Sequence, residues 1–129
     1  MSKDTLNFYE DDEGMVAQVV LEGFGSNEVD IIYLESDEVD QQLEDSVDFL
    51  REHQNEMSKS VTTAIKAYIK DVYHSDSTGL ELMKVYVFPG EHEEFGLLFR
   101  WEGDVEHGVG ARLTGLNVVK VGSAEVAFV

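Results

Sequence analysis

Residues 29–50, VDIIYLESDEVDQQLEDSVDFL, contain the place where the spacing of apolar side chains changes from two residues to 3.6. Residues 29–34 are rich in β-branched side chains and are expected to form a strand. After them Ser36 is suited to cap a helix, because acidic residues follow it and favour the positive end of the helix dipole. The apolar stripe of that helix is expected to be Val39, Leu43, Val47 and Leu50.

A second apolar stripe follows a polar interruption at residues 53–55. Its members are Met57, Val61, Ala64, Ile65, Tyr68, Ile69 and Val72. The opposite face of this second helix carries Lys59, Lys66 and Lys70. Two helices separated by a short break favour an αα-hairpin packed on a sheet. One long bent helix is the alternative, and the sequence does not decide between the two.

Strands are predicted on both sides of the helical segment. Residues 6–9 and 15–21 precede it, with an acidic turn between them, and residues 82–88 and 95–101 follow it. In the last 27 residues five glycines separate short apolar segments, which is typical of consecutive β-hairpins. The predicted order βββ-αα-ββββ indicates a single α+β domain over residues 1–129, with a mainly antiparallel sheet and a two-helix insertion.

The composition excludes several kinds of partner and chemistry. Among 129 residues, 27 acidic and nine basic side chains give a net charge of −18, which argues against nucleic-acid binding through a basic patch. The chain has no cysteine, and therefore no disulfide, thiolate zinc site or cysteine nucleophile. No apolar run approaches the roughly 18 residues of a membrane span, and no signal-peptide stretch is visible at the start. A cytoplasmic location without membrane contact is therefore expected.

The negative charge is concentrated in the first part of the chain. Residues 1–50 contain 15 acidic residues and one lysine, a net charge of −14, whereas residues 51–129 have a net charge of −4. A concentrated negative field steers a basic protein partner toward the surface that carries it. The candidate contact residues on the predicted acidic helix are Asp37, Asp40, Glu44, Asp45 and Asp48.

A second group of candidate binding residues lies in the segment from Trp101 to Gly110. It contains Trp101, Asp104, Glu106 and His107. An imidazole titrates near neutral pH, and a neighbouring carboxylate can orient the ring or raise its pKa. These groups could form a small polar site between two strands. In the alternative interpretation, Glu106 and His107 close a turn while Gly108 and Gly110 supply unusual backbone angles. Another acidic group, residues 91–94, is expected to be a solvated loop.

The C-terminal pattern resembles a widespread group of uncharacterised bacterial proteins. In that group an aromatic strand leads into Asp-x-Glu-His-Gly-φ-Gly, followed by a hairpin that ends in Val-Gly. Here the pattern is Trp101, then residues 104–110, then Val119-x-Val121-Gly122. Some members of the group look like immunity proteins of bacterial toxin systems. The resemblance implies an α+β fold and immunity-like binding, and it supplies no catalytic residues.

Three explanations of the charge pattern follow. The first is a non-enzymatic, acidic, cytoplasmic binding protein that neutralises a basic partner such as a toxin, with no cofactor or metal. The second is a metal-assisted hydrolase that uses Asp104, Glu106 and His107, although such a site needs ligands from a second place in the fold. The third is a salt-adapted or very soluble protein whose acidity needs no partner. A terminal strand at residues 125–129 would offer an edge for a homodimer.

Overall fold

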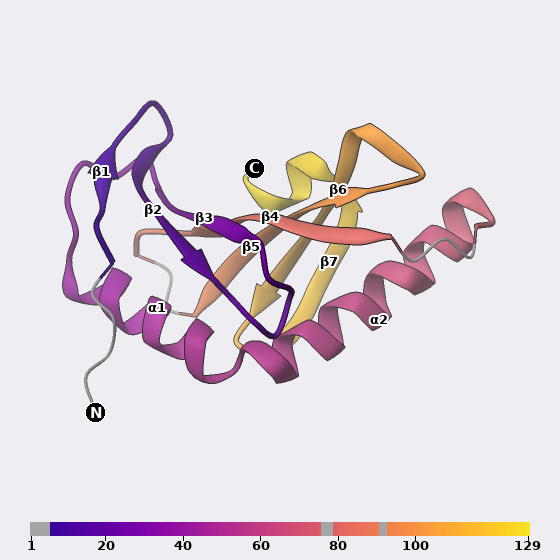
Figure 1. The fold of residues 1–129 in the computed structure, drawn as a ribbon, viewed down its shortest axis with the longest axis horizontal. Coiled ribbons are helices and arrows are strands. Elements are labelled where there is room, and N and C mark those ends of the chain that lie inside the picture. The colour runs from indigo at the N-terminus through magenta and orange to yellow at the C-terminus, as the bar shows by residue number, and fades with distance from the viewer. Residues whose placement is uncertain (1–5, 76–78, 91–92) are drawn as a thin grey trace.

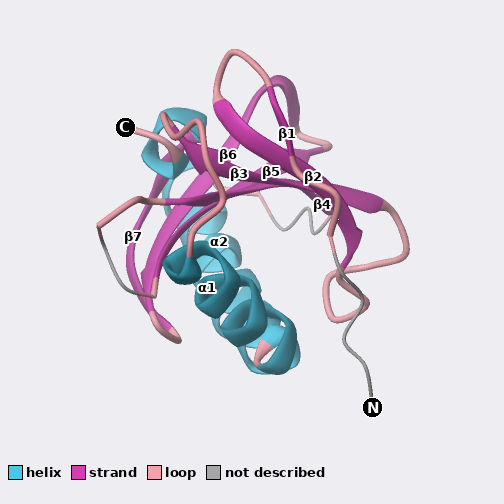
Figure 2. Ribbon diagram, turned by 90° about the vertical axis from the view of Figure 1, so that its left-hand side faces the viewer, coloured by secondary structure: helices cyan, strands magenta, loops and turns pink. Residues whose placement is uncertain are grey.

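The computed structural model describes residues 6–75, 79–90 and 93–129. A seven-stranded sheet has two long helices on one face and a short 3₁₀ helix on the other (Figure 1, Figure 2). The elements in chain order are β1 (Tyr9–Glu10), β2 (Gly14–Val20), β3 (Glu28–Leu34), α1 (Gln41–Glu52), α2 (Gln54–Tyr73), β4 (Leu80–Val87), β5 (Glu94–Trp101), β6 (Asp104–Thr114), β7 (Asn117–Ser123) and η1 (Ala124–Ala127).

The strands lie in the sheet in the same order as in the chain, from β1 to β7. Neighbouring strands are antiparallel except β3 and β4, which run parallel. A parallel pair needs a crossover connection, and α1 and α2 provide it. The predicted α+β class, the mainly antiparallel sheet and the position of the helical insertion are therefore confirmed.

Helix α1 begins later than the sequence suggested. Asp40, and not Ser36, is its N-cap, because Oδ1 of Asp40 accepts a hydrogen bond from the Leu43 amide at 3.0 Å. Val39 lies outside the helix and is 43% exposed, so its assignment to the apolar stripe was wrong. The rest of the predicted stripe is confirmed by the burial of Leu43, Val47 and Leu50.

The two helices follow one another along the sheet and do not fold back as a hairpin (Figure 1). Only His53 separates them, with φ −112° and ψ 14°, and it is both the C-cap of α1 and the N-cap of α2. The predicted αα-hairpin is therefore wrong, and the structure shows the alternative arrangement, in which the helical segment runs end to end with a bend at His53.

The main core lies between the sheet and the helices. Four side chains of α2 belong to this core and are fully buried, as the second apolar stripe predicted: Met57, Val61, Ile65 and Ile69. From the sheet, alternate residues of the central strands point toward the helices, among them Ile31, Val85 and Leu97. Val72 is 52% exposed and does not belong to this core. In the described part of the chain, no helix is both long and apolar enough to cross a membrane.

The other face of the sheet has a smaller core, covered by η1. Ala127 of η1 packs there with Val16, Ile32 and Tyr86. Residues 124–127 form a 3₁₀ helix, so the expectation of a terminal strand at residues 125–129 was wrong. Residue 96 of the sheet is a glycine, and a Cβ there would overlap the Ala127 carbonyl oxygen, so a glycine is needed for η1 to lie this close.

Candidate functional site

The residues Asp104 to His107 lie at the start of β6, not in a loop. Strand β5 ends at Trp101 and β6 begins at Asp104, so the turn consists of only two residues. The pairing of β5 and β6 then shifts in register between Phe99 and Trp101, which marks a β-bulge. The predicted polar group is thus part of an irregular strand pair at the edge of the β5–β6 turn.

Asp104 and His107 bind each other across this bulge. The Nδ1 atom of His107 is 2.9 Å from Oδ1 and 3.1 Å from Oδ2 of Asp104. The backbone amide of His107 also donates to Oδ1, at 3.3 Å. Gly108 follows with φ +71°, and a Cβ there would lie 2.7 Å from the Phe99 carbonyl oxygen. These contacts agree with the interpretation that the motif closes a local bend of the backbone.

The remaining members of this group do not complete a pocket. The side chain of His107 is 74% exposed, and Glu106 is exposed as well. Trp101 is 2% exposed, and its ring packs against Tyr73 with centroids 4.9 Å apart. Within the described ranges, no three His, Asp or Glu side chains are grouped so that they could hold a metal ion. Glu91 and His92 lie outside the described residues.

Asp40 has a structural role in the predicted acidic contact surface. Besides capping α1, it accepts hydrogen bonds from the hydroxyl of the buried Tyr33, at 2.9 Å to each carboxylate oxygen. The pKa of Tyr33 is raised to about 12, mainly because its hydroxyl is buried. The hydrogen bond to Asp40 and the negative charge of Asp40 raise it further, and the charge of Glu38 has a smaller effect in the same direction. The first candidate, Asp37, precedes the helix and is exposed.

The other candidates of this surface lie on α1. Glu44 and Asp45 are exposed, whereas Asp48 is partly buried. Asp45 accepts a hydrogen bond from the Gln41 side chain at 2.9 Å. Of the predicted contact residues, the helix itself therefore exposes only Glu44 and Asp45. The loop before the helix exposes Asp37 and, in addition, Glu38.

The structure adds the β1–β2 turn to this acidic surface. Gly14 pairs with Leu34, and the amide of Glu35 donates to the Glu13 carbonyl oxygen at 2.7 Å. The turn between β1 and β2 therefore lies beside the β3–α1 loop, at the left of Figure 1. We call the carboxylates of these two segments the acidic end: Asp11, Asp12, Glu13, Glu35, Asp37 and Glu38. The sequence predicts the strands at residues 15–21 and 29–34, and antiparallel pairing of these two strands would have placed the two acidic segments side by side.

Two of these carboxylates are engaged in contacts within the chain. Asp11 accepts a hydrogen bond from the Glu13 amide at 2.8 Å. The Glu13 side chain pairs with Lys84 at 3.1 Å and accepts a hydrogen bond from the Tyr86 hydroxyl at 3.1 Å. Burial of Tyr86, followed by the charge of Glu13, raises the pKa of its phenol. The exposed carboxylates that remain for a partner are those of Asp12, Glu35, Asp37 and Glu38.

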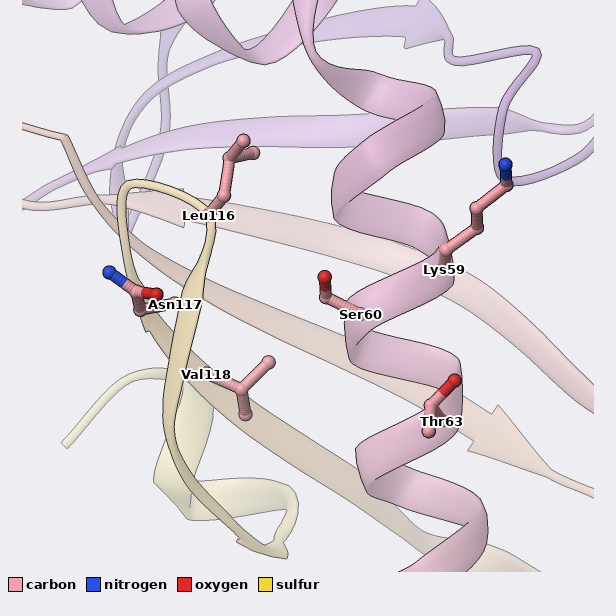
Figure 3. A pocket seen from close by; sticks show the side chains of 6 residues that line it. All are labelled: Lys59, Ser60, Thr63, Leu116, Asn117 and Val118. Carbon is pink, nitrogen blue, oxygen red and sulfur yellow. The ribbon is translucent and has the colours of Figure 1, made fainter.

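A shallow, open groove lies between α2 and the β6–β7 turn (Figure 3). Its walls are Lys59, Ser60 and Thr63 of α2, with Leu116, Asn117 and Val118 opposite. In Figure 3 the hydroxyl of Ser60 faces the turn, whereas the side chain of Lys59 points away from it. No local sequence pattern indicates this groove, because its two walls are about 55 residues apart in the chain.

Comparison with known proteins gives no relative from which a function could be transferred. No family model matches the chain. No curated protein and no solved structure matches it either.

Proposed function

We propose that this chain is a non-enzymatic, acidic binding protein of the bacterial cytoplasm that neutralises a basic protein partner, in the manner of an immunity protein. The observation that supports the proposal most is the acidic end. Two segments that are about 20 residues apart in the chain meet there and expose the carboxylates of Asp12, Glu35, Asp37 and Glu38. The group of uncharacterised proteins that the C-terminal pattern resembles includes some immunity-like members, which is the second reason for this proposal.

The electrostatics favour a basic partner. The net charge of −18 attracts cations at long range, and the acidic end adds a local concentration of carboxylates. Such complementarity raises the association rate of a basic protein and excludes acidic ones. Glu44 and Asp45, at the start of α1, extend the same surface.

The metal-assisted hydrolase is the weaker hypothesis. Asp104 and His107 use their polar atoms on each other and on the bulge, and the structure brings no third ligand to them from another described segment. A catalytic metal site normally has three protein ligands and an open position. The bend-closing role accounts for the same residues without further assumptions.

A co-expression experiment tests the proposal. Each gene adjacent to the one for this chain is expressed alone and together with it, and growth is measured. We expect that one neighbouring product is basic and inhibits growth, and that co-expression of this chain restores growth. If no neighbouring product is toxic, or if toxicity persists in the presence of this chain, the immunity-like function is refuted.

Two variants locate the contact surface in the same assay. The end variant, Asp12→Asn with Asp37→Asn and Glu38→Gln, removes three exposed carboxylates from the acidic end. The distal variant, Glu22→Gln with Asp71→Asn and Glu106→Gln, has the same net charge and changes exposed residues elsewhere. Protection should be lost or reduced only in the end variant. Equal loss in both would show that total charge, and not this surface, is responsible.

A further inference from the structure

The β1–β2 turn carries part of the acidic end and is attached to the sheet by a very short strand. Strand β1 consists of two exposed residues, which pair with Met15 and Val16 of β2. Within the turn, the Asp11 amide donates to the Gly14 carbonyl oxygen at 2.9 Å, and Gly14 itself is fixed by its pairing with β3. A pair of strands this short is only marginally stable by itself. The position of residues 11–13 therefore depends on contacts from outside the turn.

Electrostatic repulsion works against this position of the turn. Residues 10–13 are four consecutive acids, and the β3–α1 loop beside them carries Glu35, Asp37 and Glu38. The two segments meet at the hydrogen bond from the Glu35 amide to the Glu13 carbonyl oxygen, at 2.7 Å. Like charges on neighbouring segments repel each other, most strongly at low ionic strength. A compensating cation is therefore needed to keep the turn beside the loop.

Strand β4 supplies this cation through the side chain of Glu13. The Glu13 carboxylate lies 3.1 Å from Nζ of Lys84 and accepts a hydrogen bond from the Tyr86 hydroxyl, also at 3.1 Å. These two residues are 71 and 73 positions further along the chain. The side chains of Lys84 and Glu13 are 33% and 38% exposed, so salt screens their pair less than a fully exposed one. Tyr86 is buried in the smaller core with Val16 and Ile32, so Glu13 ties the turn to a fixed part of the sheet.

We infer that Lys84 and Tyr86 are positioning residues of the acidic end. They hold Glu13, and through it the β1–β2 turn, next to the β3–α1 loop, so that the carboxylates of Asp12 and Glu35 face a basic partner together. Pre-organised charged groups bind more tightly because less ordering is left to occur on binding. This inference rests on the proposed function, since it concerns the surface that the basic partner contacts.

Substitution of Lys84 distinguishes positioning from total charge, because the two predict opposite effects. Lys84→Gln makes the net charge more negative by one unit, so total charge alone predicts tighter binding of a cationic probe. A positioning role predicts weaker binding, because the turn is no longer held beside the loop. The matched control is Lys66→Gln, which makes the same change in net charge at an exposed lysine of α2. Lys84→Arg should retain the behaviour of the unchanged chain, because a guanidinium group also pairs with a carboxylate.

Hydrogen exchange measured by NMR tests the positioning role without a partner. In Lys84→Gln we expect the amides of Asp11 and Glu35 to exchange at least about fivefold faster than in the unchanged chain. Tyr86→Phe removes only the hydrogen bond and should give a smaller increase at the same two amides. Lys66→Gln and Lys84→Arg should change these rates less than about twofold, and the amides of β5 should exchange alike in all variants. Unchanged rates at Asp11 and Glu35 in Lys84→Gln would overturn the inference, as would an equal increase in β5.

Titration with a hexalysine peptide at low ionic strength tests the consequence for binding, with the amide shifts of the full chain as the readout. We expect shifts at residues 10–14 and 35–38, an affinity at least about threefold weaker in Lys84→Gln, and an equal or higher affinity in Lys66→Gln. An affinity of Lys84→Gln that equals or exceeds that of the unchanged chain, or an absence of shifts in these two segments, would overturn the inference. If both measurements give the expected results and the co-expression assay fails, only the immunity-like function is refuted.

Discussion

At the scale of single residues, Asp40 determines where the helical segment begins. Its carboxylate caps α1 through the Leu43 amide and accepts two hydrogen bonds from the buried hydroxyl of Tyr33. The sequence shows several acids near the helix start, and Ser36 is an equally good cap by residue type. Only the contact with a strand residue that lies in the core distinguishes Asp40, and such a contact is invisible in local sequence.

Replacing Asp40 with Ala should lower the free energy of unfolding by about 2 kcal/mol, because it removes the cap and leaves the Tyr33 hydroxyl buried without a partner. Urea denaturation measures the loss. The exposed Asp37→Ala is the matched control and should change stability by less than about 0.5 kcal/mol. A similar effect of both substitutions would show that Asp40 does not anchor the helix.

The stability at alkaline pH should reveal the same contact. The pKa of Tyr33 is about 12 in the folded chain, against 10 for an unperturbed tyrosine. A raised folded-state pKa means that its contribution is complete below pH 10 and is lost as the pH rises toward 12. The free energy of unfolding, measured in urea at pH 8, 10 and 11, should therefore decrease with pH. In Tyr33→Phe the decrease should be smaller, and an unchanged decrease would contradict this assignment.

At the scale of secondary-structure elements, local sequence patterns predicted most strands, but they predicted neither the 3₁₀ helix η1 nor the irregular start of β6. Alternating or continuous apolar residues placed β2 to β5 within about two residues of their observed positions. The segment after Ser123 looked like another strand, yet it forms η1, because Gly96 leaves room for Ala127 to lie on the sheet. The irregular start of β6 before Gly108 was likewise predicted as a turn between two strands. Both features depend on pairing between strands, which one segment alone does not show.

Gly96→Ala should detach η1 from the sheet, because its Cβ would overlap the Ala127 carbonyl group. We expect a loss of about 1–3 kcal/mol in the free energy of unfolding, together with faster hydrogen exchange in residues 124–129. The control is a chain that ends at Ser123, which already lacks the contact. If the same substitution destabilises the truncated chain equally, the effect of Gly96 is not due to η1.

At the scale of the whole molecule, the exposed carboxylates of the acidic end and the lysines of α2 lie in different places. The acidic end lies beside the start of α1, whereas Lys59, Lys66 and Lys70 belong to α2, which runs away from that end (Figure 1). The sequence predicted the excess of acid in residues 1–50 and the lysines of the second helix. It could not predict that the β1–β2 turn joins the β3–α1 loop, or that β7 forms one edge of the described sheet. Those relations arise from the pairing of β2 with β3 and from the position of β7.

The most direct test of the central claim is the association rate of the chain with its basic partner, measured by stopped-flow at 50 and 300 mM NaCl. The partner is the toxic neighbouring product from the co-expression assay. If the acidic end steers binding, the end variant should associate at least about fivefold more slowly than the distal variant at low salt, and the difference should shrink at high salt. Equal rates for the two variants, or a difference that salt does not change, would contradict the claim.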